Sequence, residues 1–420
     1  MRVEPTPFYI RGKGGDDHRD KKCQHDLQGG GHMERLEFEL ETVTPLFLGG
    51  AELRGKPELR AASVRGALRF WSRALFGGFT GDDAKGLESL RNIEAKVFGS
   101  TKVGASPIIV QLEHDTFETT SFSQLVQRDN VTRSYGLPGV AYLFFSARKP
   151  EREAIKPGTR FNLTLRLRPG TVENRNVLRR VCAALWLLTH LGGLGTRSRR
   201  GGGSLQVVRV THVFDDLPAF EIQAREPSKL RDELQAGLSR LRESLPHPAR
   251  GVEPPTTYDV LHPRTCKIWV IDRSFNSWDT ALDSFGRTMQ KFRSRKQPDY
   301  GNIKQALQGK GLREPVKRAA FGLPIIFRFT SLNNRTDTLE GEYHSRRASP
   351  LLVRVTKLAN GKCVLVLTLF YSQLLPEGEK IRLKKQGPSA KVNTPGFEVL
   401  HEFLRELGTK TGPLLEVTNW

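Results

Sequence analysis

Hydrophobic and charged residues alternate with a period of two where regular patterning of the chain begins. Leu36, Phe38 and Leu40 are separated by glutamates, which is typical of a strand with one buried face. Further strands are expected at residues 107–113, 141–147, 161–167 and 204–214. Apolar residues at helical spacing predict helices over residues 63–77 and 176–191. The order strand, helix, strands, helix, strand is the ferredoxin-like alternation.

A second strand–helix pattern follows and repeats this type of fold. Its strands are expected at residues 266–271, 323–329, 349–355 and 362–370, and its helices at 277–292 and 397–407. One charged helix at residues 228–244 lies in a segment that breaks the pattern. We therefore predict an α+β protein with a disordered tail at 1–33, a domain at 34–214, a connector or insertion at 215–265 and a second domain at 266–420.

The helix expected at residues 63–77 has two different faces. Apolar residues from Val64 to Leu75 share one face with Trp71, so we expect the tryptophan to pack in the core. The other face carries Arg65, Arg69 and Arg73. These guanidinium groups either contact a ligand or form an ordinary solvated face, and the pattern leaves both interpretations open.

The net charge indicates a polyanionic partner. Lys and Arg number 66 against 45 Asp and Glu, which gives +21 at pH 7. A charge of this size repels itself in the compact state, and nucleic acid is the commonest partner that offsets it. A basic but inert surface, or an anionic protein partner, remains the alternative.

A glycine-rich loop spans residues 192–203 and contains six glycines together with Arg197, Arg199 and Arg200. Glycine lets the backbone approach a ligand closely, and arginine binds phosphate in a bidentate fork. The loop follows a helix, precedes a strand and lacks lysine, so it is no Walker A motif. The alternative is a tight turn with solvated arginines. We expect alanine at all three positions to leave the fold intact.

A second basic segment spans residues 287–318 and has ten Lys and Arg against two acids. Phe292 and Tyr300 interleave with these charges, and stacking combined with phosphate contacts is suited to sequence-tolerant single-strand binding. A flexible basic loop is the alternative.

Motifs for catalysis or metal binding are scarce. The four cysteines include no C-x-x-C pair, and Cys182 and Cys363 lie in apolar stretches typical of a core. His190 lies in the buried helix, and the pair Asp82 and Asp83 is typical of a solvated loop. We expect no catalytic residue, metal or cofactor. No run of about 18 apolar residues predicts a membrane span, and we expect a cytoplasmic protein.

Two segments together resemble a known family. Residues 44–75 (TPLFLGGAELRGKPELRAASVRGALRFWSRAL) resemble the opening strand, loop and first helix of RAMP proteins, and residues 192–205 (GGLGTRSRRGGGSL) resemble their glycine-rich loop. The chain is similar to the RAMP proteins of type III-B CRISPR (Cmr) effector complexes, in particular the first-numbered RAMP subunits. FGLPI at 321–325 and RRASPLLVRV at 346–355 extend the resemblance into the second half.

The resemblance implies two RRM-like, ferredoxin-like domains and a non-catalytic place at the head of the complex. There the subunit would help to capture single-stranded target RNA near the 3′ end of the guide crRNA, beside other RAMP subunits. RAMP subunits that cut RNA have an aspartate in the loop before the first helix, and residues 46–62 contain none. The predicted RNA-binding residues are Arg54, Lys56, Arg60, Arg65, Arg69, Arg73, Arg197, Ser198, Arg199, Arg200, Lys291, Arg293, Arg295 and Lys296.

The sequence leaves two other functions open. A metal-independent RAMP endoribonuclease would process guide precursors through a histidine close to the reacting 2′-OH, with His190 or His212 as candidates. A purely structural cap would contact only protein.

Overall fold

The computed structural model describes residues 35–50, 55–148, 151–169, 174–211, 214–245, 251–386 and 390–420. The residues described belong to one compact unit, Glu34–Trp420. The predicted N-terminal tail lies outside them. None of the helices in the described ranges is long and apolar enough to cross a membrane.

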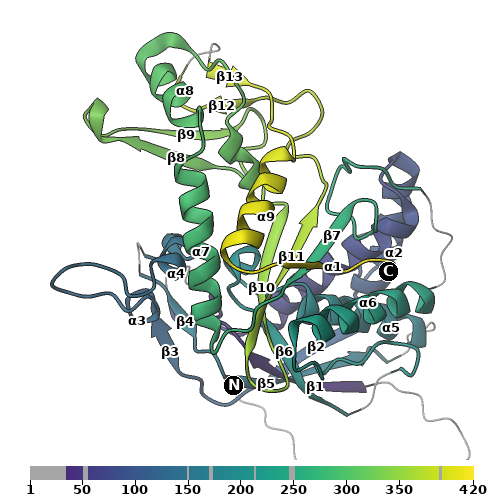
Figure 1. The fold of residues 1–420 in the computed structure, drawn as a ribbon. Helices are drawn as coiled ribbons and strands as arrows, with labels where there is room; N and C mark the ends of the chain where they lie inside the picture. Colours follow the sequence, from purple (N-terminus) through teal and green to yellow (C-terminus); the bar gives the residue numbers. More distant parts are fainter. Residues whose placement is uncertain are drawn as a thin grey trace, which may run out of the picture. The chain divides into compact units, whose positions relative to one another are not determined.

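The period-two pattern produces the first sheet (Figure 1). Its antiparallel strands follow the order β2-β5-β1-β6, the ferredoxin-like order. The strands are β1 (Arg35–Thr42), β2 (Ile108–Glu113), β5 (Arg160–Leu167) and β6 (Leu205–Val210). The helices that connect them are α1 (Ala61–Thr80), α2 (Ala84–Phe98) and α5 (Asn174–His190). Phe38 is fully buried on the apolar side of β1, while Glu37 and Glu39 lie on the polar side.

A second sheet repeats this topology in the order β10-β11-β7-β14. Its strands are β7 (Cys266–Ile271), β10 (Leu351–Lys357), β11 (Cys363–Phe370) and β14 (Leu414–Glu416). Its helices are α7 (Trp278–Ser294) and α9 (Glu398–Lys410), which lie side by side in front of β10 and β11 (Figure 1). Every residue of β11 is buried, because its other face also packs against protein. The chain thus contains two ferredoxin-like domains.

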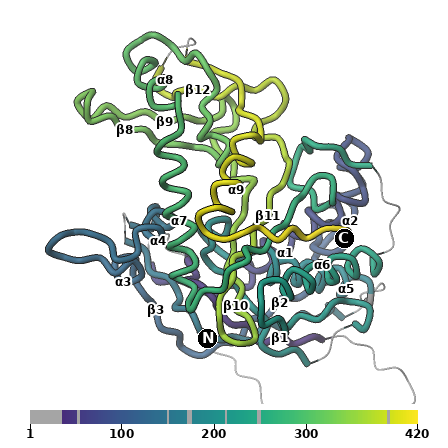
Figure 2. Tube along the Cα trace, viewed as in Figure 1, coloured from purple at the N-terminus to yellow at the C-terminus, as the bar shows by residue number. Residues whose placement is uncertain are grey.

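A smaller sheet interrupts the second domain. Figure 2 shows that two separate stretches of chain meet in it, one before β10 and one after β11. The order is β13-β12-β9-β8. Its elements are α8 (Asp299–Gln305), β8 (Ile325–Phe329), β9 (Arg335–Gly341), β12 (Ile381–Leu383) and β13 (Lys391–Val392). Its own apolar core includes Ile303, Phe327 and Leu339.

The strand predicted at residues 141–147 is wrong. This segment forms α4 (Pro138–Leu143) and a short 3-10 turn (Phe145–Ala147). Asp283 on α7 accepts hydrogen bonds from the backbone N–H of Gly139 at 2.7 Å and of Val140 at 3.4 Å, and so caps α4 from another element. A Cβ on Gly139 would lie 2.0 Å from the Asp283 carbonyl oxygen, so close packing of the two helices requires glycine there.

The remaining elements pack on the two domains. Helix α6 (Pro227–Ser244) lies in the predicted connector and packs on β7. A two-stranded ribbon, β3 (Thr119–Ser121) and β4 (Glu153–Ile155), accompanies α3 (Phe122–Leu125) and α4.

The Asp82–Asp83 pair, expected from the sequence to lie in a solvated loop, has structural roles. Asp83 caps α2 by accepting the N–H of Gly86 at 2.6 Å, and Asp82 accepts the N–H of Thr257 at 2.9 Å. Helix α2 itself was not predicted, because its capping residue was assigned to a loop.

Trp71 lies in the core, as the helical pattern predicts. Only 2% of its surface is exposed. Its ring contacts Phe70 on the same helix and Phe370 on β11, with ring centroids 5.2 and 6.3 Å apart. A Cβ at Gly192 would lie 2.4 Å from the Trp71 indole nitrogen. The side chain therefore packs the first helix against both the glycine-rich loop and the second domain.

We predict that Trp71→Ala destabilises the protein by about 3–5 kcal/mol, because it leaves a cavity between the two domains. Urea unfolding followed by circular dichroism measures the loss, and Trp71→Phe should lose less. A Trp71→Ala variant with unchanged stability and lost RNA binding would place the tryptophan in the ligand site instead.

Candidate RNA interface

The glycine-rich loop is held firmly by backbone hydrogen bonds. After α5 ends at His190, the N–H of Leu194 donates to the Gly203 carbonyl at 2.8 Å, and the N–H of Gly203 donates to the Pro45 carbonyl at 2.9 Å. Ser198–Arg200 form a 3-10 turn that packs on β10. Arg197 precedes the turn with φ at 67°, a left-handed conformation that is unusual outside glycine. The loop is therefore a fixed platform.

Two of its three arginines bind residues that follow the first domain in the chain. Arg199 donates to the Asp259 carboxylate at 2.7 Å and to the Ser349 carbonyl at 2.6 Å. Arg200 donates to the Phe321 carbonyl at 2.8 Å, and its burial lowers its pKa to about 9. Because these contacts join the loop to the second domain, the structure leads us to expect that alanine at Arg199 or Arg200 destabilises the fold, contrary to the expectation from the sequence.

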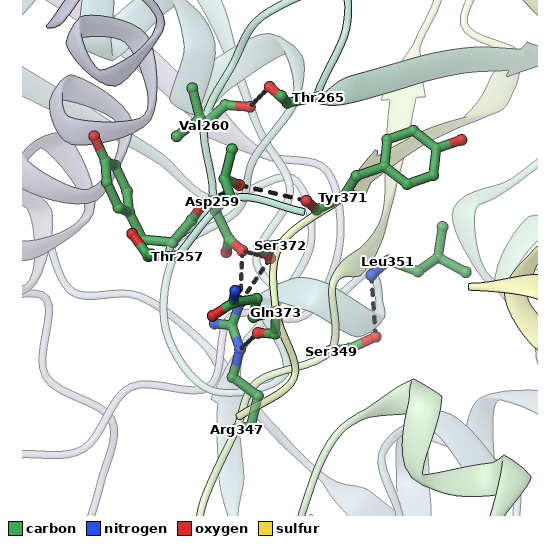
Figure 3. A network of polar contacts seen from close by, with 12 residues as sticks. Thr257, Asp259, Val260, Thr265, Arg347, Ser349, Leu351, Tyr371, Ser372 and Gln373 are labelled. Carbon is green, nitrogen blue, oxygen red and sulfur yellow. Dashed lines mark hydrogen bonds and ion pairs between the residues drawn. The ribbon is translucent and has the colours of Figure 1, made fainter. Parts of the chain in front are cut away.

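Asp259, which binds Arg199, lies at the centre of a polar network with Arg347 and Ser372 (Figure 3). Its carboxylate accepts from Ser372 Oγ at 2.6 Å, from Arg347 at 3.0 Å and from Arg199 at 2.7 Å. Arg347 also donates to the Gln373 carbonyl at 3.2 Å. Burial raises the pKa of Asp259, but Arg199 and Arg347, with the Ser372 hydroxyl, outweigh burial and lower the pKa below its usual range.

A cluster of arginines meets at one edge of the loop. It contains Arg152, Arg197, Arg200 and Arg293, which come from the turn before β4, the loop and α7. Arg293 donates to the Tyr142 hydroxyl at 2.7 Å, and Arg197 donates to Ser146 Oγ at 2.7 Å. The Nε atoms of Arg152 and Arg293 are buried without a hydrogen-bond partner among the described residues.

This arginine cluster holds like charges together. Burial lowers the pKa of Arg197, and Arg293 and Arg152 lower it further, while Tyr142 acts in the opposite direction. Within the described part of the chain, none of the four guanidinium groups forms an ion pair with a carboxylate. Like charges at close range destabilise the fold unless an anion joins them. The positive charge and the unpartnered Nε atoms of the cluster favour an anion such as a phosphate group.

The arginines of α1 have partners of their own. Arg69 donates to Glu94 of α2 at 2.8 Å, and Arg73 lies 3.3 Å from the same carboxylate. Arg65 donates to the Ile108 carbonyl at 3.0 Å. Arg69 and Arg73 remain about 40% exposed in their side chains, so they face solvent while they join the two helices. Contact with RNA by these residues stays a prediction.

The other predicted residues fall into two groups. Lys56, Lys291 and Arg295 are exposed and have no side-chain partner in the described ranges, and Ser198 is partly exposed. Lys296 pairs with Glu402 and lies over the Phe292 ring, and Arg60 donates to the Gly49 carbonyl at 3.1 Å. Arg54 lies outside the described residues. Sequence analysis missed Arg152 and Tyr142; the cluster of basic residues at 148–152 was a signal that it did not use.

His190 is a core residue, as predicted. Its ring stacks on Trp186 with centroids 4.0 Å apart, and its Nδ1 lies 2.8 Å from the Trp186 carbonyl. Burial, and then the charge of Arg354, lower its pKa to about 3. His212 lies outside the described residues. The described residues include no group of three His, Cys, Asp or Glu arranged to hold a metal.

We predict that Asp259→Asn destabilises the protein by about 3–5 kcal/mol at pH 7, because it leaves two largely buried arginines without their carboxylate. The native pKa of Asp259 is lowered, so the charged carboxylate stabilises the fold above its unfolded pKa of about 3.9, and this contribution is lost as pH falls through the lower native value. Urea unfolding from pH 6 to pH 3 should show the unfolding free energies of the wild type and of Asp259→Asn converging at the acidic end. A difference between them that stays constant with pH would contradict the stabilising role of the charged Asp259 carboxylate.

The chain has clear relatives. A sequence profile of the RAMP superfamily matches residues 39–206. The CRISPR system Cmr subunit Cmr1-2 of Pyrococcus furiosus is 36% identical over 189 residues, which cover 42% of this chain and 96% of that protein. The Cmr subunit Cmr1-1 of the same organism is 29% identical over 351 residues, covering 81% of this chain and 89% of the relative.

Solved structures agree with these relatives. The crystal structure of apo Cmr1 from Pyrococcus furiosus matches with a TM-score of 0.59 at 25% identity, covering 92% of this chain and 99% of that one. A chain of the type III-B Cmr-beta complex bound to cognate target RNA shares the fold, with a TM-score of 0.55 at 14% identity, over 89% of this chain and 99% of that chain. The chain therefore belongs to the RAMP superfamily, in the family of Cmr1 subunits of CRISPR Cmr systems.

Proposed function

We propose that the chain is an RNA-binding subunit of a type III-B CRISPR effector complex, and that it acts in the cytoplasm without cleaving RNA. It helps to hold single-stranded target RNA against the guide crRNA near the guide's 3′ end, at the head of the complex and beside other RAMP subunits. Base pairing with the guide selects the sequence, and the protein holds the backbone. We assign the two domains to residues 34–214 and 266–420.

The observation that carries this proposal is the arginine cluster. Its four guanidinium groups come from three segments of the chain, and no carboxylate within the described ranges neutralises them. A phosphate that entered the cluster would supply hydrogen-bond acceptors and remove the mutual repulsion. The exposed cations Lys291 and Arg295 lie near the C-terminal end of α7, the helix that contributes Arg293.

The polar face of the first sheet argues for contact through loops. Glu39 on this face pairs with Arg160 at 3.3 Å and with Arg209 at 3.4 Å. In β1, β2, β5 and β6 the side chains on this face are charged, polar or aliphatic, and none is aromatic. Single-stranded RNA is commonly stacked on sheet aromatics in RRM domains, and that contact has no platform here.

Two observations support a non-catalytic role. The relatives are named as complex subunits. The His190 ring is buried in the core against Trp186, out of reach of a 2′-hydroxyl group. Incubation of the purified chain with repeat RNA tests the alternative, and specific cleavage would refute the proposal.

We predict that the triple variant Arg152→Ala, Arg197→Ala, Arg293→Ala binds single-stranded RNA more weakly, to a similar degree for different sequences, because phosphates carry no sequence information. The slope of log affinity against log salt should fall by about 0.7 for each phosphate that the variant no longer neutralises. Fluorescence anisotropy at several salt concentrations measures both quantities, with thermal melting as the folding check.

Lys229→Ala is the matched control for this experiment. Lys229 is an exposed cation on α6, 3.8 Å from Asp232, and its removal should leave the slope nearly unchanged. If the triple variant keeps wild-type affinity and slope, the cluster does not bind RNA. If the affinity loss is confined to one RNA sequence, the cluster reads bases and the backbone mechanism is wrong.

A further inference from the structure

A buried carboxylate fixes an exposed turn at the end of β9. Only 4% of the Glu379 side chain is exposed. Its Oε1 accepts the backbone N–H groups of Tyr343 and His344, both at 2.8 Å. Its Oε2 lies 2.6 Å from His344 Nδ1. One carboxylate thus makes three contacts with two consecutive residues of a turn.

The surroundings of Glu379 favour the charged form of its carboxyl group. Burial raises the pKa of the carboxyl, but the hydrogen bonds from the backbone and ring of His344 and from the backbone of Tyr343 outweigh burial and lower the pKa below its usual range. Close packing adds to this fixation, because a Cβ at Gly341 would lie 2.3 Å from the His344 carbonyl oxygen and 2.8 Å from Glu379 Oε1.

The fixed turn presents its side chains to solvent. Tyr343 is 78% exposed, and the side chain of His344 is 62% exposed. Such a turn buries little apolar surface, so its order does not serve the hydrophobic core. An exposed aromatic ring on a rigid backbone loses little conformational entropy when a flat partner stacks on it.

Cations flank the turn. Arg346 and Lys380 are exposed, and neither has an ion-pair partner in the ranges that the structure describes. Lys380 is adjacent because its carbonyl accepts the backbone N–H of Glu342 at 2.9 Å. Glu342 is itself neutralised by Lys391 at 2.6 Å. Glu377 is an exposed acid nearby in sequence, so the surface is mixed but carries more unpaired positive than negative charge.

The cavity beside this turn is a weaker candidate for a ligand site. It has a volume of about 480 Å³ and is lined by residues 372–379 and 393–397 together with Leu400. Glu379 borders it, but its oxygens already bind the turn. The turn is the better site, because the Tyr343 ring is exposed to solvent.

We propose that the turn at Tyr343 and His344 is a stacking site for one base of single-stranded RNA, with Arg346 and Lys380 contacting the phosphates on either side. Glu379 acts as the positioning residue that holds the ring in place. An exposed aromatic ring with exposed cations on nearby stretches of the chain is an arrangement that can bind single strands without reading sequence. The inference rests on the proposed RNA-binding function and adds a base-binding site on the small sheet, outside the arginine cluster.

The test uses the full chain and a 12-nucleotide single-stranded RNA of mixed sequence that carries 2-aminopurine. Stacking on the ring should quench the fluorescence of the bound probe. Tyr343→Ala should remove at least part of the quenching and weaken binding about fivefold or more, the low end of the range for one stacked base. Tyr343→Phe keeps the ring and should retain both signals.

Two further variants separate the site from general effects. Ile326→Ala is the matched control, because Ile326 is 74% exposed on β8 of the same sheet and lacks a π face. Glu379→Ala should weaken binding with Tyr343 present, and Glu379→Gln should restore part of the loss, because its amide oxygen still accepts both N–H groups. Equal affinity and quenching of Tyr343→Ala and wild type would overturn this site alone. No RNA binding by the wild-type chain would overturn the proposed function as well.

Discussion

The arrangement of the two domains depends on one buried carboxylate, Asp259. Removing a carboxylate from water costs several kcal/mol, and only a partner of opposite charge with good geometry offsets this. Here Arg199 comes from the glycine-rich loop of the first domain and Arg347 from the segment before β10 in the second. Because both arginines must reach the same carboxylate, the loop has one position relative to β10. That position places Arg197 and Arg200 in the cluster with Arg293.

A second buried charge strengthens the same interface without a carboxylate. Arg354 lies in the middle of β10, almost fully buried, and burial lowers its pKa to about 9. Its guanidinium group donates to the carbonyls of Thr189 and Leu205, the latter at 2.9 Å. Thr189 lies in the last turn of α5, where the carbonyl end of the helix dipole favours a cation. The end of α5 and the start of β6 are thereby joined to the second domain.

The sequence was most informative where a pattern is local. The sequence predicted the alternation in β1 and β5, the apolar runs of α5 and β11, and the position of Trp71. Burial of one face produces a regular spacing of apolar residues, and burial of every face produces a continuous apolar run. Prediction failed where a distant residue decides the outcome. The strand expected at 141–147 is a helix because Asp283, more than 140 residues away, caps it and Gly286 makes room for it. The side chain of Tyr142 comes to the cluster from that same misread segment, and Arg152 comes from the turn that follows it.

The partners of the arginines also depend on distant residues, so the sequence does not show which arginines pair with carboxylates and which face other arginines. Sequence gives the number of arginines but not their partners, so Arg199, Arg69 and Arg197 look alike in the chain. In the structure Arg199 and Arg69 neutralise carboxylates and hold elements together, whereas Arg197 faces other arginines. A fold gains stability from the first arrangement and loses it from the second, and local conflicts of this kind are expected at functional sites. At the turn held by Glu379 the buried charge is well paired, and it fixes in place residues that contribute little to the core. In both places the structure maintains groups that folding alone does not require, and a ligand with phosphates and flat bases would use both.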